Sequence, residues 1–234
     1  MNRLLAARSR AGHGKPELGI EFVAMRRHVD CITSLGRLAQ QMEASFVVVS
    51  NVLPYSEELK DGILYGLWAG RSYPGKRTPW TPEMLLPRID IKRGTIEPTG
   101  RLMSQTSYVA SPGRNGQSAT GHCRFVEEGS IAVAWDGGVS PCIALMHSYP
   151  CYVMRRPKQI RRYTVGNVVQ DDPAAIWTDP EYVAFRDRVH RFDFSPCTEC
   201  GGCQMSESNE EDCFGSTFPV CGDCLWARDV IQCP

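Results

Sequence analysis

The chain has 234 residues, of which 42% are hydrophobic, so it has the apolar content for a sizeable core and is not disordered by composition. Its 26 Lys and Arg residues balance its 26 Asp and Glu residues, which gives no electrostatic reason to expect nucleic acid or an anionic membrane as a partner. The sequence has neither a secretory signal peptide nor an apolar run near the roughly 20 residues that span a bilayer. We therefore expect a soluble, cytoplasmic protein.

The first 70 residues predict alternating strands and helices. Residues 18–26 and 45–53 are short apolar runs typical of buried strands. Residues 31–43 place apolar side chains at helical spacing, and residues 56–67 predict a second helix. This order predicts an α/β arrangement with parallel strands. Two strands are too few for an independent sheet, so we expect further strands from elsewhere to complete it.

Residues 71–122 lack periodicity and are rich in Gly, Pro, Ser and Arg, which predicts a long irregular linker. Beyond it, residues 123–142 predict a hairpin with strands at Arg124–Val126 and Ile131–Trp135. The dipeptide Asp136-Gly137 is a strong signal for the turn between two strands.

Two short helices are predicted within residues 172–190. The dipeptides Asp172-Pro173 and Asp179-Pro180 each place an N-cap residue before a proline at the first helical position. The basic run at residues 155–162, RRPKQIRR, is open to two interpretations. It is either an ordinary solvated loop, which we favour, or a site for an acidic partner or a phosphate.

The cysteines dominate the second half, which contains ten of the eleven. In a reducing compartment, clustered cysteines are more often metal ligands or redox groups than disulfides. The pairs Cys197-x2-Cys200 and Cys221-x2-Cys224 can each present two sulfurs to one metal site. We interpret Cys31 and Cys151 as ordinary buried thiols. The candidate metal ligands are Cys123, Cys142, Cys197, Cys200, Cys203, Cys213, Cys221, Cys224 and Cys233.

Iron–sulfur clusters and structural zinc ions both take four thiolates, so the residue types alone do not separate them. Two sites of four thiolates would use eight of the nine candidates and leave one spare. The upstream pair, Cys123 and Cys142, lies too far from the later CxxC pairs to belong to one compact zinc ribbon. This distance favours iron–sulfur clusters, with a zinc-binding interaction domain or a pure electron-transfer module as the alternatives.

These motifs resemble those of a known family. The pattern Cys123-x13-Gly137-x4-Cys142 resembles the opening of a SPASM domain, the auxiliary-cluster module of radical S-adenosylmethionine (radical SAM) enzymes. Residues 166–186 resemble the segment that joins the two cysteine groups of that domain. Residues 18–59 resemble the last strands of the partial (β/α)6 radical SAM barrel, and residues 195–234 resemble the ending of radical SAM maturases associated with tungsten-cofactor oxidoreductases.

The resemblance implies three regions: the C-terminal fragment of the barrel at 1–70, the irregular linker at 71–122 and the SPASM domain at 123–234. It implies two auxiliary 4Fe-4S clusters. Cys123 and Cys142 would help to hold the inner cluster, joined by one cysteine from the Cys213–Cys224 stretch. Cys197, Cys200 and a late cysteine would hold the outer cluster. Glu21, on the first strand, resembles a barrel residue that lines the cofactor cleft.

The sequence departs from the family in two ways. It has no CxxxCxxC motif for the cluster that starts the radical chemistry, and the spacing after Cys200 is longer than usual, with Cys203 interposed. We therefore expect an N-terminally truncated chain that binds S-adenosylmethionine only as part of a full-length or complemented enzyme. The implied partners are an upstream radical SAM half and a metalloenzyme or peptide substrate. The sequence identifies no catalytic residue.

Overall fold

The computed structural model describes residues 2–11, 17–66, 83–85, 89–90, 92–105, 109–110, 121–200 and 202–232. Within them the chain forms two compact units. Unit 1 comprises Met1–Val52, Gly62–Gly116 and Asp229–Pro234, and unit 2 comprises Leu53–Asp61 and Gln117–Arg228. The domain boundaries predicted at residues 70 and 122 stay a prediction.

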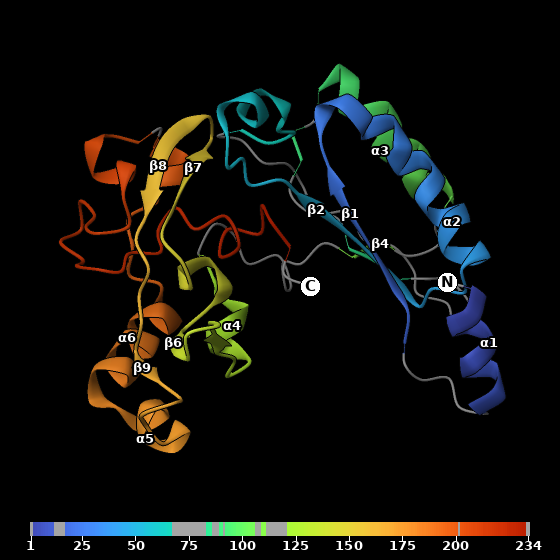
Figure 1. Ribbon diagram of the computed structural model, residues 1–234. Helices are drawn as coiled ribbons and strands as arrows, with labels where there is room; N and C mark the ends of the chain where they lie inside the picture. Colours follow the sequence, from blue (N-terminus) through green and yellow to red (C-terminus); the bar gives the residue numbers. More distant parts are fainter. Residues whose placement is uncertain are drawn as a thin grey trace. The chain divides into compact units, whose positions relative to one another are not determined.

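Unit 1 is built on a parallel sheet in the order β1-β2-β3-β4, of which β1, β2 and β4 are labelled in Figure 1. The first two strands align in register, with Gly19 opposite Phe46 and Ala24 opposite Asn51, which confirms the predicted strands and their parallel pairing. In the described part of the chain the sheet is open, with β1 and β4 at its edges. Its strands are β1 (Gly19–Ala24), β2 (Phe46–Asn51), β3 (Glu83–Leu85) and β4 (Val109–Ala110).

The helices of unit 1 provide the apolar cover that a parallel sheet requires. Ile32, Leu35 and Leu102 are buried with Val47 and Val49 of β2 in one core cluster. The predicted helix at 31–43 is α-helical only in its later part, because the chain first forms a 3-10 helix. The helical elements are α1 (Asn2–Ala11), η1 (Arg26–Ser34), α2 (Leu35–Gln41) and α3 (Arg93–Gln105).

Helix α3 and strands β3 and β4 lie within the segment predicted to be irregular. The sequence conceals this helix because Gly94, Pro98 and Gly100 interrupt its pattern, and both residue types are poor helix formers. Leu102 is nevertheless completely buried. Packing against unit 1 therefore overrides the low helix propensity of the segment.

Residues 229–232 return to the sheet of unit 1. The Asn51 side-chain amide donates to the Val230 carbonyl at 2.7 Å, across a sequence separation of 179 residues. The Gln232 backbone N–H donates to Ser50 Oγ at 3.2 Å. Val230 is buried. The end of β2 is therefore held by residues from the far end of the sequence.

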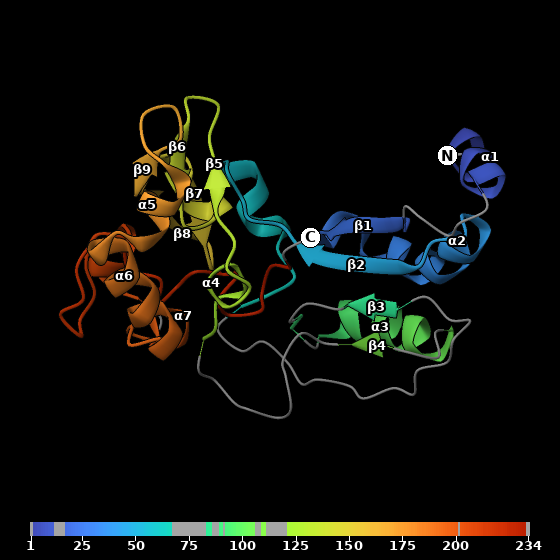
Figure 2. The same cartoon turned by 90° about the horizontal axis from the view of Figure 1, so that it is seen from below.

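Unit 2 contains two small antiparallel sheets (Figure 2). The predicted turn at Asp136-Gly137 is confirmed: Asp136 Oδ1 accepts from the Gly138 N–H at 3.0 Å, and Gly137 has a φ of 81°, which glycine adopts without strain. The strands are β5 (Ala132–Val133), β6 (Gly138–Ser140) and β9 (Gly166–Asn167) in one sheet, and β7 (Tyr149–Val153) and β8 (Arg156–Ile160) in the other.

The strand predicted at Arg124–Val126 is wrong, because these residues form the short helix α4 (Arg124–Glu127). Val126 is buried against the core of unit 2. A helical turn lets one residue of the stretch enter the core, whereas a strand would have needed a neighbouring strand to pair with. The 3-10 helix η2 (Glu57–Gly62) likewise begins where a longer helix was predicted and ends at Gly62.

The two helices predicted at 172–190 are confirmed as α5 (Pro173–Thr178) and α6 (Pro180–Arg191). Asp172 accepts from the Ala174 N–H at 2.8 Å. Asp179 accepts from the N–H groups of Glu181 and Tyr182 at 2.9 and 3.0 Å, so both aspartates are N-caps. None of the helices in the described part of the chain has the length and apolar composition to span a bilayer. The remaining short helices are η4 (Ile143–Leu145), α7 (Cys197–Cys200) and η5 (Gln204–Glu207).

Candidate cysteine-rich metal centre

Four of the predicted ligands lie together in unit 2, and we call them the inner thiol group: Cys123, Cys142, Cys221 and Cys224. Each of the six pairs within this group interacts electrostatically, so ionisation of one thiol raises the pKa of another. Cys123 precedes α4 and Cys142 precedes η4. Cys221 and Cys224 share one turn, in which the Cys224 N–H donates to the Cys221 carbonyl at 3.1 Å. We expected one cysteine of the Cys213–Cys224 stretch here, and the structure brings two.

Packing and backbone hydrogen bonds hold these distant segments together. The four cysteines lie against a core cluster to which α6 contributes Tyr182, Phe185 and Val189. The His122 N–H donates to the Ala227 carbonyl at 2.9 Å, which ties the segment before Cys123 to the segment after Cys224. The inner thiol group is therefore a product of the fold of unit 2 rather than of local sequence.

Burial raises the pKa values of the thiols in the inner group. It raises the pKa of Cys224 to about 12 and that of Cys221 well above its usual value. Burial also raises the pKa values of Cys142 and Cys123. The nearby Arg188 cation opposes this effect at Cys221. Because metals bind the thiolate, metal binding here would displace protons from all four positions.

In the described part of the chain, no three or more His, Cys, Asp or Glu side chains converge closely enough to hold a single metal ion. A structural zinc ion needs four ligands at about 2.0–2.3 Å from one atom. A 4Fe-4S cluster instead takes its four thiolates on separate iron atoms and fills the space between them. Both kinds of site take four thiolates, and the inner thiol group supplies four.

A second set of cysteines, which we call the outer cysteine segment, comprises Cys197, Cys200, Cys203 and Cys213. Cys197 and Cys200 are the ends of α7 and interact electrostatically. Cys197 is buried, and its Sγ lies 3.0 Å from Ser195 Oγ. Burial raises the pKa of Cys197, and the hydrogen bond to Ser195 opposes this. Cys200, Cys203 and Cys213 are exposed. Cys233 lies outside the described residues.

The other candidate residues are placed in different surroundings. Glu21 is exposed on β1, opposite Val48 of β2, and its role in binding a cofactor stays a prediction. Cys151 is buried on β7, as predicted. Cys31 is exposed, so its interpretation as a buried thiol was wrong. Its 3-10 helix turns Val29 and Ile32 into the core and leaves Cys31 facing outward.

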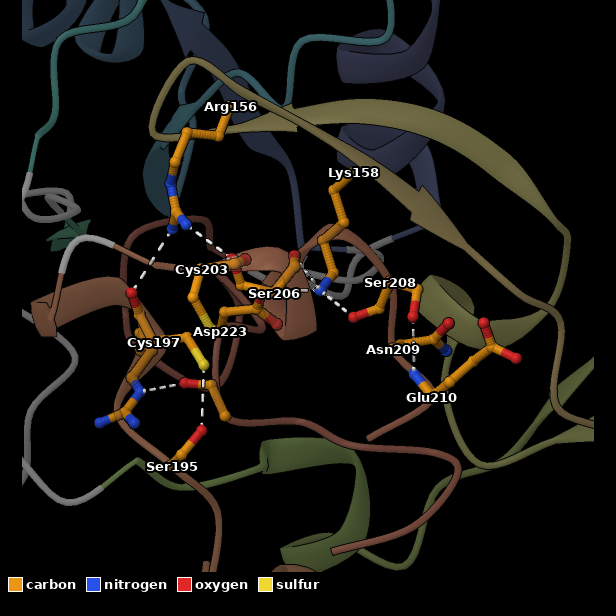
Figure 3. A network of polar contacts seen from close by, with 12 residues as sticks. Arg156, Lys158, Ser195, Cys197, Cys203, Ser206, Ser208, Asn209, Glu210 and Asp223 are labelled. Carbon is orange, nitrogen blue, oxygen red and sulfur yellow. Dashed lines mark hydrogen bonds and ion pairs between the residues drawn. The ribbon is translucent and has the colours of Figure 1, made fainter. Parts of the chain in front are cut away.

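The basic run at 155–162 is not a solvated loop, because most of it forms strand β8. Arg155 pairs with Asp61 at 3.5 Å, Arg161 with Glu210 at 3.0 Å, and Arg162 with Asp136 at 2.6 Å. Arg156 and Lys158 point inward to the segment at 195–224 (Figure 3). The basic residues of this segment therefore hold β8 in place through ion pairs and hydrogen bonds to acidic and polar groups of unit 2.

The sequence analysis did not predict the polar contacts of Arg156 and Lys158 with the segment at 195–224, which we call the polar frame. Arg156 Nη1 donates to Ser206 Oγ at 2.6 Å, and Nη2 donates to the Cys197 carbonyl at 3.4 Å. The guanidinium lies against Gly202, where a Cβ would overlap Nη1. The signal in the sequence was the basic run itself. Its partners could not be read because they lie 41 to 65 residues further along the chain.

Comparison with known proteins adds two findings. Residues 123–204 match the SPASM family, an iron–sulfur cluster-binding domain. Over 237 aligned positions the chain is 27% identical to the tungsten-containing aldehyde ferredoxin oxidoreductase cofactor-modifying protein of Pyrococcus furiosus. That alignment covers 100% of this chain and 60% of the relative, so the chain spans less than two thirds of the relative's length. No solved structure is significantly similar to the chain.

Proposed function

We propose that this protein holds two 4Fe-4S clusters of the auxiliary type on its cysteines, because residues 123–204 match the SPASM family, an iron–sulfur cluster-binding domain. The observation that carries the proposal is the inner thiol group. Cys123 and Cys142 lie inside the matched region, whereas Cys221 and Cys224 lie beyond it and reach the same place through the fold. These four thiols would hold the inner cluster.

The donor chemistry of both cysteine sets fits such clusters. Iron–sulfur clusters take four cysteine thiolates each, and the inner thiol group supplies four. Cys197 and Cys200 would provide two ligands of the outer cluster, with the others drawn from Cys203, Cys213 and Cys233. When bound, clusters of this kind supply one-electron transfer, at a potential set by surrounding charge, hydrogen bonds and solvent exposure.

The wider role is the maturation or modification of a metalloenzyme, with a tungsten oxidoreductase as the first candidate and a peptide as the second. This part of the proposal is supported by the name of the relative, a cofactor-modifying protein, and by the open parallel sheet of unit 1, which is compatible with part of a radical SAM barrel. Glu21 would line the binding site for S-adenosylmethionine in a full-length or complemented enzyme. We place this activity in the cytoplasm.

Anaerobic reconstitution with iron and sulfide, followed by metal and sulfide analysis, tests the proposal. The chain should hold about eight iron and eight sulfide ions, four of each per cluster. Cys31→Ser is the matched control, because Cys31 is an exposed cysteine of unit 1 and should not change the iron content. Stoichiometric zinc without sulfide would contradict the proposal and favour a zinc-binding interaction domain.

A further inference from the structure

Lys158 and Asp223 form a buried ion pair, and Asp223 belongs to the turn from Cys221 to Cys224. We propose that this pair links the two sets and that its two charges set the reduction potentials of the clusters that they hold. The inference rests on the proposed function, because it concerns clusters on these cysteines. Lys158 and Asp223 would act on the clusters through charge and position, without binding iron themselves.

Lys158 is at the centre of the polar frame (Figure 3). Its Nζ donates to Asp223 Oδ2 at 2.7 Å, to the Ser208 carbonyl at 2.6 Å and to the Ser206 carbonyl at 3.0 Å. An ammonium group has three N–H donors, so these contacts satisfy all of them. The two side chains are only 3% and 6% exposed. Lys158 therefore fixes both the loop after Cys203 and the turn that carries Asp223.

Asp223 lies in the turn between Cys221 and Cys224, within the inner thiol group. On the other side of the pair, the Ser206 carbonyl accepts from Lys158, and the Ser206 hydroxyl accepts from the Cys203 N–H at 3.2 Å and donates to the Cys203 carbonyl at 2.6 Å. The buried pair is thus joined to the inner thiol group through Asp223 and to the outer cysteine segment through Lys158 and Ser206.

Stability alone does not account for such a pair. Replacing a buried ion pair by well-packed apolar residues is often neutral or stabilising, because removing two charges from water costs several kcal/mol for each ion. What an apolar pair could not supply is a fixed positive and a fixed negative charge beside the thiolates. Nearby net charge is one of the factors that set the potential of an iron–sulfur cluster.

The proposal predicts shifts of opposite sign. Asp223→Asn removes a negative charge and leaves the ammonium unbalanced, which favours the more negative, reduced cluster and raises its potential. Lys158→Met removes the positive charge, leaves the carboxylate unbalanced and lowers the potential. The double variant Lys158→Met/Asp223→Asn should return the potentials toward the wild-type values. A purely structural role for the pair would not reverse the sign between the two single variants.

The experiment is a redox titration of the reconstituted full chain, followed by electron paramagnetic resonance, with iron content measured on every sample. Dithionite supplies the electrons, and each cluster accepts one. Arg161→Met and Glu210→Gln are the matched controls. They break an ion pair between neighbouring parts of the same two segments, but its side chains are 62% and 42% exposed and screened by water. We expect no resolvable shift in either control.

Shifts in the same direction in both single variants, or equal shifts in the controls, would overturn the inference. If Lys158→Met loses its iron, the test rests on Asp223→Asn. The asparagine amide has the shape of the carboxylate and can still accept a hydrogen bond from Lys158, so this variant should keep its iron. An unchanged potential in that variant would count against us. A wild-type chain that takes up neither iron nor sulfide overturns the proposed function itself, and so is a separate result from a loaded chain with unmoved potentials.

Discussion

The inner thiol group and the outer cysteine segment differ in how they are built. The inner group sits against a core cluster, with Cys142 buried and backbone hydrogen bonds joining its segments. In the outer segment Cys197 is buried, but Cys200, Cys203 and Cys213 are exposed on short elements and loops. Packing therefore brings the inner thiol group together before any metal binds. In the outer cysteine segment, only Cys197 is held by packing.

This difference indicates which of the two sites couples metal binding to folding. A site whose ligands are already gathered by packing gains little order when it is filled, whereas exposed loop ligands must be ordered by the metal itself. We expect the inner site to fill first and the outer segment to become ordered on filling.

Cys142→Ser should remove the inner cluster while the outer one is kept. Iron should fall from about eight to about four ions per chain, because each 4Fe-4S cluster needs its four thiolates. Iron and sulfide analysis after anaerobic reconstitution measures this. Cys151→Ser is the control for a buried thiol outside the group and should keep about eight. Full iron in Cys142→Ser would show that Cys142 is not a ligand.

Lys158→Met should destabilise the apoprotein by about 3–5 kcal/mol, because it leaves the Asp223 carboxylate buried without its partner. Urea unfolding of the reduced, metal-free chain measures the free energy of unfolding. Arg161→Met breaks the exposed pair with Glu210 and should cost about 0–1 kcal/mol. Equal losses in the two variants would contradict the burial argument.

Asp179→Ala removes the N-cap of α6 and should cost about 1 kcal/mol. Because α6 supports the inner thiol group through Tyr182 and Phe185, iron should be lost more readily from the inner site. Chelator-induced loss of iron, compared with the free energy of unfolding, measures both effects. Asp187→Ala, on the exposed side of the same helix, should stay within about 0.5 kcal/mol of the wild type.

Raising the pH from 7.5 to 9.0 should weaken the apoprotein slightly. Burial raises the pKa of Cys142 above its usual value of 9.0, so the unfolded chain ionises first and stability is lost as the pH passes about 9. The loss should be about 0.4 kcal/mol for this thiol at pH 9.0, where half of it is ionised in the unfolded chain. Urea midpoints at the two pH values measure it. Cys142→Ser should show a smaller difference between them, and a stability that rises with pH would refute the argument.

Local signals predicted the elements that local interactions determine. The apolar runs gave β1 and β2, the Asp-Pro pairs gave α5 and α6, and Asp136-Gly137 gave the turn before β6. These predictions succeed because the contacts that stabilise each element lie within the same short stretch of the chain. Helix α3 escaped prediction because its helical state depends on packing rather than on propensity.

The candidate site was predicted as a list of residues but not as an arrangement. The sequence predicted nine of the cysteines to be metal ligands, and the family pattern placed Cys123 and Cys142 at the same cluster. The arrival of both Cys221 and Cys224 beside them depends on tertiary contacts about 100 residues apart, and periodicity holds no information about those. The partnership of Lys158 with Asp223 was hidden for the same reason, since 65 residues separate them.

The contact between Asn51 and Val230 also has a consequence in time. A ribosome adds about 5–20 residues per second, so Val230 is made roughly 10–35 seconds after Asn51. Throughout that interval β2 lacks its last hydrogen-bonding partners, while the cysteines of unit 2 are still emerging. The hydrogen bonds at the end of β2 can therefore form only after Cys221 and Cys224 have been synthesised. Unit 1 completes its contacts late in translation.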